Sequence, residues 1–176
     1  VTLALRAKFP EIQVKLYHQG QDQQVGDDLL ESAAQWVSQQ LGDNIFSVEG
    51  APMAAEVGKL LVSGKATLAV AESCTGGLVA NWLTNTPSSS DYFLLSAVTY
   101  DNQAKVNVLG VSPQTLIQCG AVHEQVAAQM AQGARKVSDA DYGLATTGIA
   151  GPSGGSPEKP VGTVCIAAES AETTMT

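Results

Sequence analysis

One short stretch of this chain combines reactive side chains with the residues of a tight turn. The hydroxyl of Ser73 and the thiol of Cys74 follow an apolar run, Ala66 to Ala71, that predicts a buried strand. Two glycines come next, and helical spacing of apolar residues begins at Leu78. This order of elements directs backbone N–H groups toward an anion and places a side chain at the carboxyl edge of a parallel sheet. Ser73 is therefore a candidate nucleophile.

Each reactive group also has a simpler interpretation. A serine between a strand and a helix is often an N-cap, and a cysteine there is often a small buried apolar residue. A hydroxyl nucleophile also needs a base. Lys105 is the best-placed lysine, because it follows the predicted strand Phe93–Tyr100 by five residues. A lone lysine is by default solvated. The two histidines, His18 and His123, are poorly placed to serve Ser73.

A second glycine-rich segment, Thr146–Pro160, follows another predicted buried strand. It contains four glycines, three prolines and four hydroxyl side chains. Glycines let backbone N–H groups approach a phosphate, and Lys159 adds a positive charge. The spacing is neither that of a Walker loop nor G-x-G-x-x-G. The segment alone leaves two possibilities open, a phosphate site and a structural turn.

The elements that must position these residues alternate between strands and helices. We expect strands at 66–71, 93–100, 142–146 and 161–168, and helices at 53–63, 78–84, 102–108, 113–119 and 122–137. This alternation predicts an α/β fold, a layered and largely parallel sheet flanked by helices. A small α+β segment precedes it, with strands at 3–7, 12–17 and 45–48 and a helix that begins at Asp27. We place the boundary at 50–52.

The composition of the 176 residues restricts the class of protein. The net charge of −8 argues against a nucleic-acid partner. The three cysteines form no C-x-x-C pair and indicate reduced thiols in the cytoplasm. No metal site is expected, because neither histidine has a second ligand type at metal spacing. No apolar run is long enough to span a membrane, and the N-terminus lacks the layout of a signal peptide.

Five blocks of this sequence together resemble the CinA C-terminal domain family. They are Ala71–Gly77, Val98–Lys105, Gly120–Val122, Thr147–Gly155 and Lys159–Val164. The resemblance covers about residues 53–168, and residues 1–50 resemble the end of the KH-like middle domain of CinA proteins. We therefore expect a partial KH-like adaptor at 1–50. At 53–176 we expect a CinA C-terminal domain without the final helix and Gly-Asp-Arg-like segment of the family.

The resemblance implies a nicotinamide mononucleotide (NMN) deamidase of the cytoplasm, an amidohydrolase of NAD salvage with a Ser/Lys dyad and neither metal nor cofactor. Carried over by position, Ser73 is the nucleophile and Lys105 its base. Ser90 is a rival nucleophile, and Tyr100 relays or orients the proton. Ser88 stands where the family usually has glycine, and His123 where it usually has serine.

The resemblance also implies a substrate site. Thr147 and the N–H groups of Thr75, Gly76 and Gly77 would hold an oxyanion. The phosphate would be held by the loop that contains Gly148, Gly151, Gly154, Gly155 and Lys159. We expect a homodimer that binds NMN and neither nucleic acid nor membrane. Two other interpretations stay open: a non-catalytic nucleotide-binding or interaction module of a competence/damage-inducible protein, and a thiol enzyme that uses Cys74.

Overall fold

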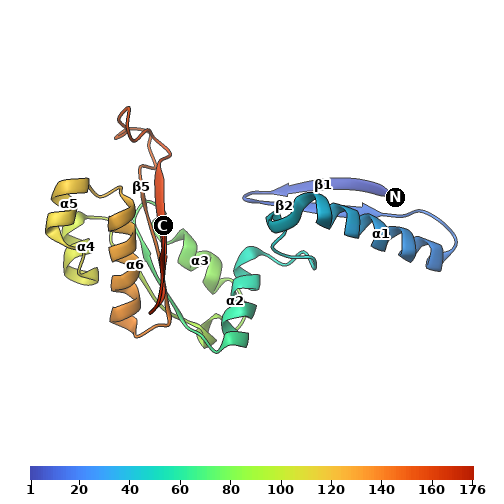
Figure 1. Cartoon of the computed structure of the whole chain (residues 1–176), viewed down its shortest axis with the longest axis horizontal. Coiled ribbons are helices and arrows are strands. Elements are labelled where there is room, and N and C mark those ends of the chain that lie inside the picture. The colour runs from blue at the N-terminus through green and yellow to red at the C-terminus, as the bar shows by residue number, and fades with distance from the viewer. The chain divides into compact units, whose positions relative to one another are not determined.

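The computed structural model describes all residues from Val1 to Thr176, and the chain divides into two compact units. Unit 1 is Val1–Glu56 and unit 2 is Val57–Thr176. Figure 1 shows the elements of both units with their labels. Because each unit has its own internal contacts, the two are described separately.

Unit 1 consists of a hairpin and one long helix. β1 (Thr2–Lys8) pairs antiparallel with β2 (Glu11–Tyr17), as the alternating sequence predicts. α1 (Gln23–Leu41) begins one turn earlier than the prediction at Asp27. The reason is the N-cap, because the carboxylate of Asp22 accepts from Val25 N–H at 3.2 Å.

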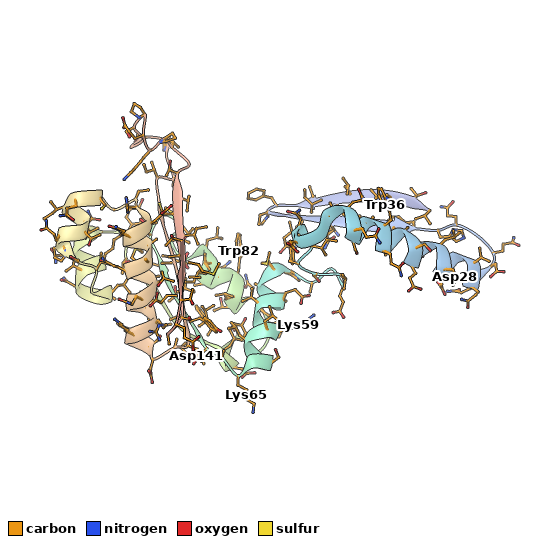
Figure 2. The ribbon with its side chains drawn as sticks, in the orientation of Figure 1. Asp28, Trp36, Lys59, Lys65, Trp82 and Asp141 are labelled. Atoms are coloured by element: carbon orange, nitrogen blue, oxygen red, sulfur yellow. The ribbon has the colours of Figure 1, made fainter.

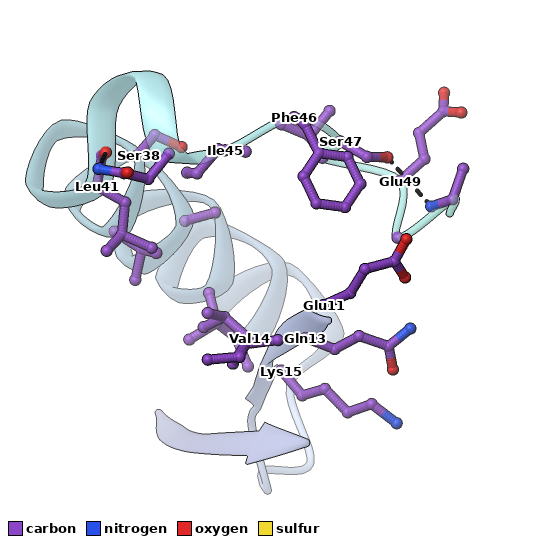
Figure 3. Close-up of a pocket in the computed structure, with 18 residues that line it drawn as sticks. Glu11, Gln13, Val14, Lys15, Ser38, Leu41, Ile45, Phe46, Ser47 and Glu49 are labelled. Carbon is purple, nitrogen blue, oxygen red and sulfur yellow. Dashed lines mark hydrogen bonds between the residues drawn. The ribbon is translucent and has the colours of Figure 1, made fainter. Parts of the chain in front are cut away.

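The strand predicted at 45–48 is wrong. After η1 (Gly42–Asn44), the N–H of Ile45 donates to Gly42 O, and Ser47 Oγ accepts from Ala51 N–H at 3.1 Å. These local bonds turn the chain, so the segment pairs with no strand. Figure 3 shows it as a wall of a groove of about 510 Å³ whose lining residues all belong to unit 1.

Unit 2 contains a five-stranded sheet with the strand order β4-β3-β5-β6-β7. Its strands are β3 (Leu68–Glu72), β4 (Phe93–Val98), β5 (Tyr142–Gly148), β6 (Val164–Glu169) and β7 (Thr174–Met175). β3 runs parallel to both β4 and β5, whereas β6 and β7 are antiparallel to their neighbours. The predicted α/β class with a largely parallel sheet is confirmed. β6 begins three residues later than predicted, and β7 was not predicted.

Helices cover the sheet on both faces. They are α3 (Leu78–Thr84), α4 (Asn102–Leu109), α5 (Pro113–Cys119) and α6 (Glu124–Ser138). α2 (Met53–Gly64) precedes β3, and η2 (Ser89–Asp91) precedes β4. α6 packs across β3, β5 and β6, with α4 and α5 beside it, while α3 lies on the other face against β3 and β4 (Figure 1). The core under α6 is built largely from small residues, including Ala71, Ala127 and Ala145. Small side chains let the helix approach the sheet closely.

The register of the parallel strands fixes the position of the site. Glu72, the last residue of β3, pairs with Val98 at the end of β4 and with Thr146 near the end of β5. At the amino ends of β3 and β5, the carboxylate of Asp141 accepts from both the N–H and the hydroxyl of Thr67 at 2.8 Å (Figure 2). The carboxyl ends of three strands therefore meet at one edge, where open α/β sheets bind ligands. None of the helices is both long and apolar enough to cross a bilayer.

Candidate active site

Ser73 follows the last residue of β3 and begins the turn that leads into α3. Its N–H donates to Thr146 O at 3.0 Å, and Gly76 N–H donates to Ser73 O at 3.1 Å. Gly76 and Gly77 have φ values of +60° and +99°, which glycine adopts without a steric cost. Ser73 is 7% exposed. The turn therefore holds the hydroxyl just below the surface at the carboxyl edge of the sheet.

Lys105 lies in the first turns of α4 and points back to this edge. Its side chain is buried, at 1% exposed. Nζ lies 2.8 Å from Thr99 O, 3.0 Å from Tyr100 O and 3.1 Å from Ser73 Oγ. A charged amine donates to all three atoms. A neutral amine has two N–H groups for the two carbonyls and a lone pair for the Ser73 hydroxyl.

Burial shifts the protonation of Lys105 toward the neutral amine. Burial lowers the pKa of Lys105, and the carboxylate of Asp101 and, to a smaller extent, Cys74 oppose that shift. Asp101 is the N-cap of α4 and accepts from Gln103 N–H at 2.7 Å. A lysine with a lowered pKa next to a hydroxyl is the arrangement of a general base and its nucleophile.

Cys74 is less suited to attack. Burial, more than any other cause, raises the pKa of its thiol. A thiol with a raised pKa is a poorer source of thiolate at neutral pH. Its sulfur lies against the end of β5, since a Cβ built on Gly148 would come within 3.0 Å of Cys74 Sγ. The structure therefore favours the interpretation of Cys74 as a packing residue.

The carboxylate of Glu72 occupies the amino end of α3. It accepts from the N–H groups of Gly77 at 3.0 Å, Val79 at 3.1 Å and Ala80 at 2.9 Å. Gly76 N–H is also used within the turn, by Ser73 O. Two of the three predicted oxyanion donors, Gly76 and Gly77, are thus committed to the fold.

The threonines around the turn are joined to one another and to the neighbouring connection. The hydroxyls of Thr75 and Thr146 lie 2.7 Å apart, and Thr147 Oγ1 donates to Ala121 O at 2.9 Å. Thr147 therefore ties the end of β5 to the segment between α5 and α6. Because Ala121 O takes the hydroxyl proton of Thr147, this hydroxyl can accept a further hydrogen bond but cannot donate one to an oxyanion.

The glycine-rich loop is shaped by contacts within itself. A Cβ on Gly151 would meet Val161 Cγ1 at 2.5 Å, and one on Gly155 would meet Val161 N at 2.7 Å. A Cβ on Gly154 would meet only Ile149 Cγ2, at 3.7 Å. Lys159 Nζ donates to Cys119 O at 2.9 Å, at the carboxyl end of α5. Packing of the loop thus accounts for two of its glycines, and the hydrogen bond to the end of α5 accounts for the position of Lys159.

Two predicted residues are not brought to Lys105 by their side chains. Ser90 lies in η2 before β4, whose first residue, Phe93, pairs with the first residue of β3. Ser90 is therefore at the opposite end of the parallel strands from Ser73, and the structure does not bring this rival nucleophile to Lys105. The side chain of Tyr100 is 74% exposed, and only its carbonyl contacts Lys105.

Sequence reasoning missed the carbonyl of Thr99 and the carboxylate of Glu72. A backbone carbonyl leaves no signal in the sequence, because every residue carries one. Glu72 did leave a signal, an acidic residue within the turn that precedes a helix, where a carboxylate is stabilised.

The comparisons with known proteins agree with this fold. The family model of the CinA C-terminal domain matches residues 50–176. A CinA-like protein from Desulfosudis oleivorans is 60% identical over 162 residues, which are 92% of this chain and 39% of that protein. A putative competence-damage inducible protein from Moorella thermoacetica is 47% identical over 165 residues, 94% of this chain and 40% of that protein. The chain therefore spans about two fifths of the length of these relatives.

Two solved structures are also similar. The competence/damage inducible protein CihA from Agrobacterium tumefaciens has a TM-score of 0.66 and 42% identity, covering 71% of this chain and 79% of that one. A competence-damaged protein (CinA) superfamily protein from Escherichia coli has a TM-score of 0.67 and 33% identity, covering 77% and 81%. With a family model that matches most of its length, this chain belongs to the CinA family through a CinA C-terminal domain.

Proposed function

We propose that the chain is an amidohydrolase that converts NMN and water to nicotinic acid mononucleotide and ammonia. The observation that carries the proposal is the contact of Lys105 Nζ with Ser73 Oγ at 3.1 Å. The amine donates its other hydrogen bonds to two backbone carbonyls. A carboxamide is cleaved by acyl transfer, which needs a nucleophile and a base in this relation. The choice of NMN as the substrate comes from the resemblance to the CinA family, which contains NMN deamidases.

The reaction proceeds through an ester of Ser73. Ser73 Oγ attacks the carboxamide carbon while its proton passes to Lys105 Nζ. The C–N bond then breaks, and the Lys105 ammonium returns the proton to the departing nitrogen, which leaves as ammonia. Water attacks the ester, Lys105 again takes a proton, and Ser73 leaves with that proton as the nucleotide acid is released.

Two backbone donors are available for the oxyanion. The N–H groups of Cys74 and Thr75 donate to no other residue of the chain, although the Cys74 N–H also interacts with its own thiol, whereas those of Gly76, Gly77 and Leu78 are used. Cys74 directly follows the nucleophile, the position from which an oxyanion hole commonly takes its first donor. We assign these two N–H groups to the oxyanion, in place of the wider set expected from the sequence.

The phosphate of NMN is assigned to the loop that follows β5. The N–H groups of Gly151, Gly154 and Gly155 have no acceptor within the chain. The loop starts beside the Ser73 turn, as the contact between Gly148 and Cys74 Sγ indicates. Backbone N–H groups in such a loop are suited to a single phosphate.

Release of ammonia from NMN is the test. Ser73→Ala and Lys105→Met should each lower kcat by about a thousandfold or more, because each removes one partner of the acyl-transfer step. Ser90→Ala is the matched serine control and should retain the wild-type rate, since Ser90 lies at the opposite edge of the sheet.

Wild-type turnover in both dyad variants would rule out the mechanism. A rise in melting temperature with NMN but no release of ammonia would favour the non-catalytic nucleotide-binding module. Complete inactivation by Cys74→Ala with a harmless Ser73→Ala would favour the thiol enzyme.

A further inference from the structure

We propose that Glu72 is a positioning residue, which sets the turn that carries Ser73 for attack. The inference rests on the proposed function, because it assigns a role in the same reaction. Glu72 itself touches neither the substrate amide nor Lys105 in the mechanism described above. It acts through the backbone of the turn.

Glu72 is a fully buried carboxylate, at 0% exposed. Oε2 accepts from Gly77 N–H and Val79 N–H, and Oε1 accepts from Ala80 N–H, all within 3.1 Å. None of these partners is a cation, so the negative charge of the carboxylate is stabilised by backbone N–H groups and by the positive end of α3. A buried carboxylate without a counter-ion is costly to place, and three charge-assisted hydrogen bonds offset that cost.

The main chain of Glu72 is hydrogen-bonded as well as its side chain. Its carbonyl accepts from Thr99 N–H at 2.9 Å, which continues the pairing of β3 with β4. Thr99 is also the residue whose own carbonyl accepts from Lys105 Nζ. Glu72 is therefore linked on one side to the residue that orients the base, and on the other to the far end of the nucleophile turn.

The Ser73 turn is closed between these two fixed points. Its five residues, Ser73–Gly77, begin at the Glu72 main chain and end at the Glu72 carboxylate through Gly77 N–H. Within them, Gly76 N–H donates to Ser73 O, and only the N–H groups of Cys74 and Thr75 have no acceptor in another residue. The carboxylate thus determines both the position of Ser73 and which two N–H groups face the proposed oxyanion.

A neutral isostere cannot reproduce this arrangement. In Glu72→Gln, one acceptor oxygen becomes an NH₂ donor that faces a backbone N–H. In Glu72→Asp, the charge is kept, but the side chain is one methylene shorter and cannot reach all three N–H groups. We expect the Gln variant to displace the turn more than the Asp variant does.

Glu169 offers a matched control. It is a buried glutamate in the same sheet, 6% exposed, and its two oxygens accept from Gln132 Nε2 and Thr174 Oγ1. It pairs with Gly143, near the edge of the sheet opposite to the dyad. Glu169→Gln therefore tests the loss of a buried, hydrogen-bonded carboxylate without affecting the Ser73 turn.

Two readouts separate positioning from stability, both measured well below the melting temperature of each variant. The first is kcat and KM for NMN. The second is the rate at which a serine-directed fluorophosphonate labels Ser73. In that labelling, Ser73 Oγ displaces fluoride from phosphorus and its proton passes to Lys105. Labelling needs the aligned dyad but not NMN, so it tests Glu72 even if the proposed substrate is wrong.

Glu72→Gln should lower kcat about a hundredfold with KM changed less than threefold, and should slow labelling by a similar factor. Glu72→Asp should fall between Gln and the wild type, and Glu169→Gln should match the wild type in both rates. Wild-type kcat and labelling in Glu72→Gln would overturn the inference. So would the failure of both Glu72 variants to fold, which would assign the residue to stability alone, and so would a wild-type Ser73 that no probe labels.

Discussion

Two backbone carbonyls decide where the amine of Lys105 points. Thr99 O and Tyr100 O take two of its bonds, so the third direction, toward Ser73 Oγ, is fixed whether it holds a proton or a lone pair. Because both carbonyls belong to the segment after β4, the sheet itself sets the position of the Lys105 amine. A lysine held in this way loses little side-chain freedom when it takes up the proton.

At the same scale, the charge of Asp101 should set the pH at which the base becomes active. Burial lowers the pKa of Lys105, and the Asp101 carboxylate opposes that shift. Asp101→Asn keeps an N-cap but removes the charge, so the pKa of Lys105 should fall further. The acid limb of kcat/KM should then move to lower pH by about half a unit or more.

The measurement is kcat/KM for NMN against pH in the wild type and Asp101→Asn. Asp139→Asn removes one carboxylate at the carboxyl end of α6 and is the control for net charge. A limb that stays in place or moves to higher pH in Asp101→Asn would contradict the assignment of Lys105 as the titrating base.

The sequence predicted the proximity of Ser73 and Lys105 better than it predicted the groups around them. Ser73 and Lys105 were named from their places after two strands and from the family resemblance, and the structure brings them together. Ser90 was misplaced because parallel strands put the residues before β4 and those after β3 at opposite edges. The roles of Gly76 and Gly77 as donors could not be judged, since only coordinates show that the fold itself uses both N–H groups.

At the scale of elements, the loop after β5 should be sensitive to a single methyl group. A Cβ on Gly148 would lie 2.6 Å from Thr163 O and 3.0 Å from Cys74 Sγ. Gly148→Ala should therefore push the loop away from the Ser73 turn, lower the free energy of unfolding by about 1–3 kcal/mol and reduce kcat/KM. Thermal unfolding and ammonia release measure the two effects.

Gly64→Ala is the control for this change. Gly64 ends α2, and a Cβ there would meet only Ala66 Cβ, at 4.0 Å. That variant should keep the wild-type rate and should not be less stable, because alanine favours helix over glycine. Equal effects of the two glycine substitutions would show that the close approach at Gly148 does not matter.

Elements with a strong period were predicted closely, and those set by local bonds were not. The apolar spacing of α6 and the run of β3 gave their positions within a few residues. The segment at 45–48 looked like a strand, yet hydrogen bonds of Ile45 and Ser47 turn it. The antiparallel direction of β6 was not anticipated, because strand direction depends on the path of the long loop before it and not on strand composition.

At the scale of the whole molecule, the candidate site belongs to unit 2 alone. Ser73, Lys105 and the loop after β5 all lie in Val57–Thr176, and the groove in unit 1 is lined by other residues. The function of residues 1–50 as an adaptor stays a prediction. The homodimer that the resemblance implies also stays a prediction, and light scattering of the purified chain measures it.

The free energy of unfolding should depend on pH because Lys105 is buried in the folded protein. Because the pKa of Lys105 is lowered in the folded state from a usual value of 10.5, the unfolded chain binds more protons between these two values. The free energy of unfolding therefore gains a contribution that rises with pH in that window, by at most about 1.4 kcal/mol per unit for one proton. Lys105→Met removes the contribution and leaves the two carbonyls without their donor at every pH.

The difference in free energy of unfolding between the wild type and Lys105→Met should thus move in favour of the wild type as the pH rises from neutral toward 10. Urea unfolding at a series of pH values measures it. Lys65→Met, which removes an exposed lysine after α2 (Figure 2), is the control for the loss of one positive charge. If the Lys105→Met curve runs parallel to that of the wild type, Lys105 carries its ordinary charge in the folded protein. The lysine would then be a hydrogen-bond donor to Ser73, and the base of the reaction would have to be sought elsewhere.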